Sequence, residues 1–215
     1  MYASTLALAK MAEARDEDTG DHLERMKRYT LLLAQVLRDD GLHAEVLTPE
    51  YLHALERFSP MHDIGKVGIR DNVLLKPGRL TETEYEHMKT HAVYGAAVLG
   101  EAENNVARSG RTLFRFGIEI AGNHHERWDG AGYPNGLRGP LIPLSARIVS
   151  LADVLDALTT RRPYKEPYSF ERSVGMIRES SGSQFDPEII DCFLRHQDRF
   201  RDLYRYFQNT QSASY

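Results

Sequence analysis

The sequence predicts a mostly helical protein, and two observations support this prediction. Apolar residues recur at intervals of three and four over several long segments of the 215-residue chain, which is the spacing of one helix face. Helix-start signals precede some of these segments, such as Thr48-Pro49 and the Thr81–Glu84 capping box. No segment has a convincing strand-like alternation of apolar and polar residues. We therefore expect an all-α fold with one large domain.

Three helices are expected before residue 60. Residues 3–15 are strong helix formers, and this helix is the kind of element that joins an upstream receiver or sensor domain in a longer protein. Helical spacing of apolar residues predicts the second helix over residues 21–38. Thr48 as N-cap and Pro49 at the first helical position predict the third, which ends near Pro60.

The middle of the chain alternates helices with turns. Residues 67–79 contain Gly68 and Pro77-Gly78 and are expected to be irregular. The capping box then predicts a helix to about Leu99. A polar stretch over residues 101–111 is expected to form a surface loop, and residues 113–126 a further helix.

A long loop is expected after this helix, because glycine and proline are frequent between residues 127 and 143. Trp128, Tyr133 and Leu137 give the loop enough apolar surface to be ordered. Ordered loops of this length usually carry function, so we expect this one to do so.

The C-terminal part is predicted to contain a buried helix over residues 145–160. Asp153 and Asp156 within it are conspicuous, because a buried carboxylate is costly unless it is paired or metal-bound. Ser169 is expected to cap a short helix, and Asp186-Pro187 to start the last one, through about Phe207. We divide the chain into an N-terminal helix (1–15), a catalytic domain (16–207) and a frayed tail (208–215).

Composition limits the cellular setting. The formal charge of −4 argues against a binder of duplex nucleic acid, which needs a basic face to release counterions. Cys192 is the single cysteine, so the chain forms no internal disulfide and fits a reducing cytoplasm. No apolar run approaches the roughly 20 residues that span a bilayer.

The segment His62–Lys66 has the chemistry of a metal site that handles phosphate, because an imidazole, a carboxylate and a fixed positive charge lie close together. Further candidate ligands are His22, His91, His124, His125 and Asp153. Nitrogen and oxygen ligands suit iron, manganese, nickel or zinc, and the lack of a cysteine cluster argues against a structural zinc site. Neighbouring residues such as His124 and His125 point in different directions and suit two adjacent ions. Nothing marks His43, His53, His87 or His196 as ligands.

Several of these segments resemble one family. They are His62-Asp63-Ile64-Gly65-Lys66, His91, the run His124–Pro134 with its Gly-Tyr-Pro sequence, Leu151–Thr159 and Arg162-Pro163-Tyr164-Lys165. Together they resemble the HD-GYP family, a branch of the HD metal-dependent phosphohydrolase superfamily that hydrolyses the bacterial second messenger cyclic di-GMP. The resemblance covers roughly residues 10–207. It implies an HD-type helical bundle with a long ordered Gly-Tyr-Pro loop, and a phosphodiesterase that produces linear pGpG, with GMP as an open question.

The resemblance also implies a ligand set: His22, His62, Asp63, His91, His124, His125 and Asp153. In this set Asp63 bridges two ions. The family has a glutamate four residues before His22, where this chain has the shorter Asp18, and that glutamate helps to hold a third ion in some members. We therefore predict two divalent ions, iron or manganese before nickel or zinc.

The chemistry expected of such a site is hydrolysis of a phosphodiester. Two neighbouring ions lower the pKa of a bridging water, and the resulting hydroxide attacks phosphorus. Lys66 would neutralise the phosphoryl oxygens, and Arg162 and Lys165 would hold phosphate. Asp156 would accept a hydrogen bond from a guanine edge or a ribose hydroxyl. Tyr133 either stacks on a base or holds the loop, and the acid that protonates the leaving group is unidentified.

Two alternatives remain open. The substrate is another cyclic dinucleotide, such as cyclic GMP-AMP, or the chain is a signalling module that docks a diguanylate cyclase through the Gly-Tyr-Pro loop and in which turnover is secondary. The helix at residues 3–15 is also a candidate for homodimerisation if it continues upstream.

Overall fold

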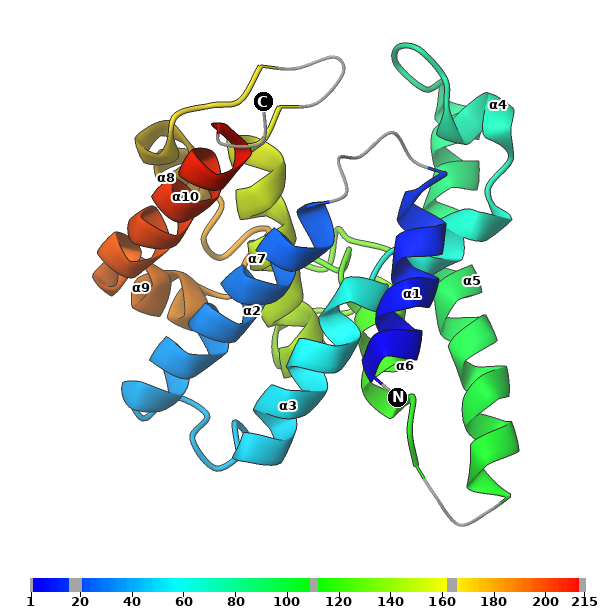
Figure 1. Cartoon of the computed structure of the whole chain (residues 1–215), viewed down its shortest axis with the longest axis horizontal. Helices are drawn as coiled ribbons and strands as arrows, with labels where there is room; N and C mark the ends of the chain where they lie inside the picture. Colours follow the sequence, from blue (N-terminus) through cyan, green and yellow to red (C-terminus); the bar gives the residue numbers. More distant parts are fainter. Residues whose placement is uncertain (1, 16–20, 109–111, 162–165, 213–215) are drawn as a thin grey trace.

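Helices form nearly all of the regular structure in the computed structural model, which describes residues 2–15, 21–108, 112–161 and 166–212 (Figure 1). The α-helices in these ranges are α1 (Tyr2–Glu13), α2 (His22–Asp39), α3 (Pro49–Phe58), α4 (Asp71–Leu74), α5 (Glu82–Ala107), α6 (Arg115–Asn123), α7 (Leu144–Thr159), α8 (Phe170–Glu179), α9 (Pro187–Arg195) and α10 (Gln197–Ser212). The 3₁₀ helices are η1 (Ser59–Met61), η2 (Ile64–Gly68) and η3 (Gly139–Leu141). Over the same ranges the β-type pairing is an isolated bridge between Ser181 and Phe185, so the all-α expectation is confirmed.

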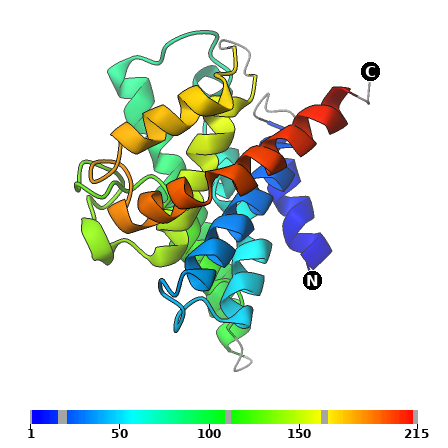
Figure 2. The ribbon, with the colours of Figure 1, turned by 90° about the vertical axis from the view of Figure 1, so that its left-hand side faces the viewer.

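Helices α2 and α7 pack against each other in the middle of the molecule (Figure 1). Leu33 on α2 and Ile148 on α7 are among the fully buried side chains of this core. Each such side chain contributes roughly 1.5–3 kcal/mol relative to exposure. Figure 2 shows α10 lying across α2, where the rings of Tyr29 and Phe207 are 6.2 Å apart.

A second set of elements packs beside this core. Helix α5 lies against α6 and against η2, and α1 covers η1 and η2. The 3₁₀ helix η2 is therefore enclosed between α1 and α5, on the right of Figure 1. This arrangement fixes the segment that contains His62 and Asp63.

The local helix signals are confirmed. The Thr48 side chain accepts a hydrogen bond from the Tyr51 N–H, and Pro49 is the first residue of α3. Thr81 and Glu84 form both bonds of the capping box. Ser169 caps α8 in the same way as Thr48 caps α3.

Three sequence-based boundaries are wrong. Helix α5 continues past Leu99 to Ala107, because its exposed polar residues are also helix formers. The expected last helix is divided at His196, whose side chain contacts Asp40 at 2.8 Å, and it continues past Phe207 to Ser212, into the expected frayed tail. The division lets both α9 and α10 bury aromatic residues in the core. The irregular segment 67–79 contains the short helix α4 and the end of η2.

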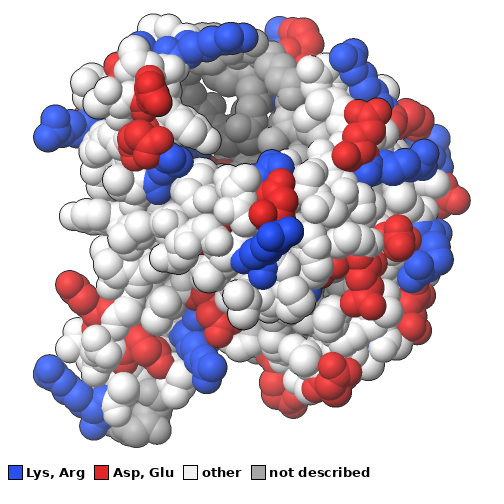
Figure 3. Space-filling view, turned by 180° about the vertical axis from the view of Figure 1, so that it is seen from behind, with Lys and Arg blue, Asp and Glu red and all other residues white. Residues whose placement is uncertain are grey.

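The surface carries mixed charges. On the face seen in Figure 3, Lys and Arg side chains alternate with Asp and Glu and do not gather into one basic area. No helix among the described residues is long and apolar enough to cross a membrane.

Gly65 permits the closest approach between η2 and α5. A Cβ atom at this position would lie 1.9 Å from the His91 carbonyl oxygen and 2.5 Å from the Gly95 nitrogen. Both neighbours are backbone atoms, so they cannot move aside by a change of rotamer. Glycine at this position therefore sets the distance between the His62–Asp63 segment and His91.

We predict that Gly65→Ala lowers the free energy of unfolding by about 3 kcal/mol, because η2 and α5 must separate. The matched control is Gly100→Ala on α5, where a Cβ atom meets nothing within 4 Å. The control should be neutral or stabilising by up to about 1 kcal/mol, because alanine favours helix. Urea unfolding of both variants measures the difference, and equal stabilities would contradict the packing argument.

Candidate metal centre

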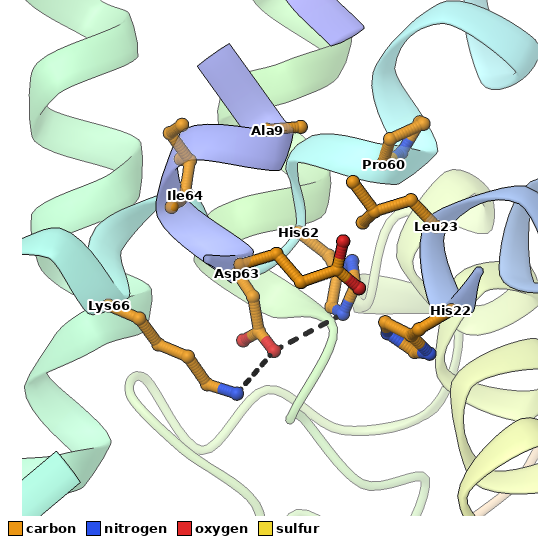
Figure 4. A pocket seen from close by; sticks show the side chains of 10 residues that line it. Ala9, His22, Leu23, Pro60, His62, Asp63, Ile64 and Lys66 are labelled. Atoms are coloured by element: carbon orange, nitrogen blue, oxygen red, sulfur yellow. Dashed lines mark ion pairs between the residues drawn. The ribbon is translucent and has the colours of Figure 1, made fainter. Parts of the chain in front are cut away.

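His62 and Asp63 lie where two short 3₁₀ turns meet. His62 ends the turn of η1, which begins at Ser59-Pro60, and Asp63 precedes η2. Both side chains face a pocket that is also lined by His22 and Lys66 (Figure 4). The two turns thus direct a consecutive imidazole and carboxylate into one space.

The seven residues expected as ligands come together in two groups from separate elements. In the first group, one ligand atom of each residue lies within 4.8 Å of the others, and the residues are Asp63, His91, His124 and His125. His124 and His125 thus lie in one group, and the expectation that they divide between two ions is wrong. The second group has the same spacing and consists of His22, His62 and Asp153. Helix α2 contributes His22 at its first turn, α5 contributes His91, the end of α6 contributes the two consecutive histidines, and α7 contributes Asp153.

The Asp63 carboxylate lies between the two groups. Its Oδ1 atom is 3.2 Å from Nε2 of His91 and 3.6 Å from Nε2 of His124. Its Oδ2 atom is 3.3 Å from Nε2 of His62, which belongs to the second group. Each oxygen therefore faces a different group, as a carboxylate that bridges two ions must.

Hydrogen bonds at the opposite nitrogen orient the imidazoles. Nδ1 of His62 donates to the Ser59 carbonyl at 3.1 Å, and Nδ1 of His91 donates to the Met88 carbonyl at 2.7 Å. His124 donates to carbonyls of the preceding turn of α6 at 3.0 and 3.1 Å. These bonds place the proton on Nδ1 and leave the Nε2 lone pair facing the centre, which is how metal-binding histidines are usually held.

These inward-facing atoms fit a metal ion. In the described part of the chain, Nε2 of His62, His91 and His124 and Oδ1 of Asp63 are buried without a hydrogen-bond partner. Buried polar atoms nearly always have one, so several unpartnered lone pairs facing one region fit a divalent cation there. The nitrogen and oxygen donors suit a first-row transition ion.

Charge around Asp63 favours its ionised form. Burial alone would raise the pKa of this carboxyl, but the Lys66 ammonium, 2.8 Å away, and the neighbouring histidines hold the pKa well below its usual value. Burial lowers the pKa of His125 well below its usual value, so its imidazole is neutral. Both residues are thus in the protonation state that binds metal.

Asp156 has a different position from the one we expected. Its carboxylate is 1% exposed, and it accepts hydrogen bonds from Arg25 at 2.6 and 3.1 Å and from Nδ1 of His22 at 2.7 Å. Since both oxygens are used inside the protein, the expectation that Asp156 contacts substrate is wrong for this arrangement. Asp156 instead orients His22, as the carbonyls orient the other histidines.

The loop after α6 is attached to this centre through Glu126. This buried carboxylate accepts hydrogen bonds from the N–H groups of Asn135 at 2.7 Å and Leu137 at 3.0 Å. The loop is also held by backbone bonds from Trp128 to Gln184 and from Asp129 to Ser183. Its position is therefore set by the residue directly after the paired histidines.

A cavity of about 440 Å³ opens beside the first group. Its lining includes His124, His125, Asp153 and Tyr133. The Tyr133 ring stacks on His125 with 4.7 Å between centroids, and burial raises the pKa of its hydroxyl. The cavity is large enough for a small ligand that reaches the histidines.

Asp18, Arg162 and Lys165 lie outside the described residues. Sequence reasoning also missed two residues that support the site, Arg25 and Glu126. Glu126 follows the paired histidines directly, and Arg25 is one helical turn after His22, so their proximity to ligands was the available signal.

The helical fold and the two histidine–aspartate groups define a helical protein with a candidate metal centre. Residues 7–189 match the HD domain family, and the chain belongs to that family.

Similar proteins have related descriptions. The chain is 47% identical over 211 residues to a probable cyclic di-GMP phosphodiesterase of Vibrio cholerae, covering 98% of this chain and 48% of the relative. It is 41% identical to a cyclic di-GMP phosphodiesterase of Thermotoga maritima, and the match covers 92% of this chain and 50% of the relative. A 3′3′-cGAMP-specific phosphodiesterase of Vibrio cholerae is 39% identical, and the match covers 90% of this chain and 34% of the relative's length. The chain thus spans half or less of the length of these relatives.

A solved structure shares the fold. It is the crystal structure of a cyclic GMP-AMP-specific phosphodiesterase of Vibrio cholerae, with a TM-score of 0.59 and 20% sequence identity over 97% of this chain and 53% of that one. At this identity the comparison supports the helical fold.

We predict that Asp156→Ala lowers the free energy of unfolding of the metal-free protein by about 3–5 kcal/mol, because the buried Arg25 guanidinium loses this carboxylate. The double variant Asp156→Ala/Arg25→Met should recover most of the loss, since neither charge of this pair remains buried without the other. Denaturant unfolding in a chelating buffer measures both. A single variant as stable as wild type would contradict the role of the ion pair.

Proposed function

We propose that this chain is a metal-dependent phosphodiesterase of the HD-GYP branch, which hydrolyses cyclic di-GMP to linear pGpG. The observation that carries this proposal is the Asp63 carboxylate, which directs one oxygen toward each of the two histidine–aspartate groups. A carboxylate shared between two ligand groups would hold two ions close together, and two-ion phosphodiester hydrolysis uses such a pair of neighbouring ions.

The ligand sets follow from the two groups. One ion would be held by His91, His124 and His125, and the other by His22, His62 and Asp153, with Asp63 shared between them. Nitrogen and oxygen donors suit iron, manganese, nickel or zinc, and among these we propose iron or manganese. When bound, two such ions supply a water of lowered pKa and polarise the phosphoryl oxygens.

Other residues of the chain would bind and orient the substrate. Lys66 lies beside Asp63 and would donate hydrogen bonds to phosphoryl oxygens, where negative charge grows during the reaction. Tyr133 would form a wall of the cavity beside the first group and remains a candidate for base stacking. Arg162 and Lys165 keep their proposed role in phosphate binding.

The choice of nucleotide rests on the relatives. Those named cyclic di-GMP phosphodiesterases include proteins at 47%, 42% and 41% identity, whereas those named cGAMP-specific are 33–39% identical. Cyclic GMP-AMP is therefore the second candidate substrate. Whether a second hydrolysis to GMP follows is part of the same proposal.

We propose that residues 16–207 form the catalytic domain and that residues 1–15 link it to a receiver or sensor domain or to a second copy in a cytoplasmic bacterial signalling protein. Docking of a diguanylate cyclase on the Gly-Tyr-Pro loop is the non-catalytic alternative. Asp63→Ala distinguishes it, because that variant should lose catalysis and keep such docking.

We predict that freshly prepared protein binds about two metal ions per chain and hydrolyses cyclic di-GMP faster than cyclic GMP-AMP. Asp63→Ala should lose at least one ion and all measurable turnover, because it removes the shared ligand. Asp191→Ala, an exposed position on α9, is the control and should behave as wild type. Elemental analysis and product chromatography on the same samples provide the measurements.

Other results of this experiment contradict parts of the proposal. Three ions per chain would show that the metal count is wrong and that Asp18 reaches a further ion. Two ions with faster turnover of cyclic GMP-AMP would favour the second substrate. Two ions without turnover of either nucleotide would favour the docking module.

We predict that Lys66→Met lowers turnover by about 100- to 1,000-fold, the usual cost of removing one group that stabilises a phosphoryl or oxyanion charge. Metal content should stay near that of wild type, because Lys66 is not a ligand. The control is Lys76→Met, which removes an ammonium that pairs with Glu84. If Lys66→Met keeps more than about a fifth of the wild-type rate, Lys66 lacks the proposed role.

A further inference from the structure

Helix α1 contributes one wall of the pocket shown in Figure 4. Ala9, Ala12 and Glu13 line this pocket together with His22, His62, Asp63 and Lys66. Glu13 and Asp63 are the two carboxylates among its described lining residues, and the Oε1 atom of Glu13 is buried. A glutamate from the N-terminal helix therefore lies beside the second ligand group.

The sequence of α1 explains how Glu13 reaches this position. Thr5, Ala9 and Ala12 are buried and lie on one face of the helix, and Glu13 continues that face by one turn after Ala9. Because two of these side chains are alanines, α1 approaches η1 and η2 closely. The small residues thus place the longer glutamate at the edge of the metal centre.

Arg15 fixes the end of α1 to the η2 segment. Its guanidinium donates to the Val67 carbonyl, to the Ile69 carbonyl at 3.0 Å and to the Asp71 carboxylate at 2.6 Å. A longer contact of 3.4 Å joins it to the carbonyl of Lys66. These bonds hold Glu13 close to the residues that follow Asp63.

We propose that Glu13 is a further ligand of the ion held by His22, His62 and Asp153. Glu13 lies beside this close group and not within it, so the carboxylate would turn about its side-chain bonds when the ion binds. The inference rests on the two-ion centre of the proposed function. It assigns a carboxylate ligand to residue 13, whereas the sequence pattern had directed attention to residue 18.

Coordination chemistry supports this assignment. His22, His62, Asp153 and the shared Asp63 oxygen provide four protein ligands, which is a complete set for tetrahedral zinc. Manganese and iron(II) commonly take six ligands, with carboxylate oxygens among them. A fifth protein ligand that carries negative charge therefore favours these ions over zinc at this position.

The test is a titration of metal-free protein with Co²⁺, followed by visible absorption and calorimetry, on wild type and Glu13→Gln. Glutamine keeps the size of the side chain, and thermal unfolding of the metal-free proteins verifies the fold. We expect the variant to bind one ion as tightly as wild type and the other at least about tenfold more weakly, with a changed spectrum for the weakened ion. Glu45→Gln, at an exposed turn, is the matched control.

Arg15→Gln gives a second measurement. It leaves Glu13 intact but releases the end of α1, so we expect the same ion to weaken by a smaller factor than in Glu13→Gln. Weakening in Arg15→Gln alone would overturn the proposal, because α1 would then act through packing. The proposal would also be overturned if Glu13→Gln bound Co²⁺ in the same way as wild type. It would be overturned too if the variant bound one ion more weakly but with an unchanged spectrum.

Failure of the proposed function gives a different pattern. Wild type that binds two Co²⁺ ions, with one weakened by Glu13→Gln, supports Glu13 as a ligand even if the manganese-loaded enzyme leaves cyclic di-GMP intact. Wild type that binds a single ion would overturn both the two-ion centre and the role of Glu13.

Discussion

The Asp63 carboxylate is the interaction on which the arrangement of the site depends. Its two oxygens face imidazoles from η1, α5 and α6, and the Lys66 ammonium lies 2.8 Å away. A buried carboxylate is stable only where such partners surround it. The close packing of η2 on α5 at Gly65 brings Asp63 Oδ1 to 3.2 Å from Nε2 of His91. The packing of these helices therefore also determines the distance between the ligands.

The way each histidine is oriented follows from its place in a helix. His91 and His124 lie within or at the end of helices, where carbonyls of the preceding turn accept the Nδ1 proton. His22 is the first residue of α2 and has no preceding helical turn. Its Nδ1 proton is instead accepted by Asp156 from α7, and that buried carboxylate is balanced by Arg25. The buried ion pair is therefore a consequence of placing a ligand at a helix start.

Features determined by nearby residues were predictable from the sequence, and features determined by distant partners were not. The caps at Thr48, Thr81 and Ser169 follow from local chemistry, and the ligand candidates follow from residue type and family resemblance. Asp156 was misassigned because its partner Arg25 is 131 residues away in the chain. The break at His196 depends on Asp40, which is also distant in sequence. Polarity alone did not distinguish a loop from the exposed end of α5.

The two sides of the centre differ in what closes them. His124, His125 and Asp153 line the larger cavity, whose wall includes Tyr133 on the loop held by Glu126. His22 and His62 line the smaller pocket, which α1 closes. The larger cavity, of about 440 Å³, has room for a small ligand, whereas the pocket beside α1 is narrower. The loop therefore forms part of the wall of the larger cavity and α1 part of the wall of the smaller pocket, and Asp63 lies between a histidine of each side.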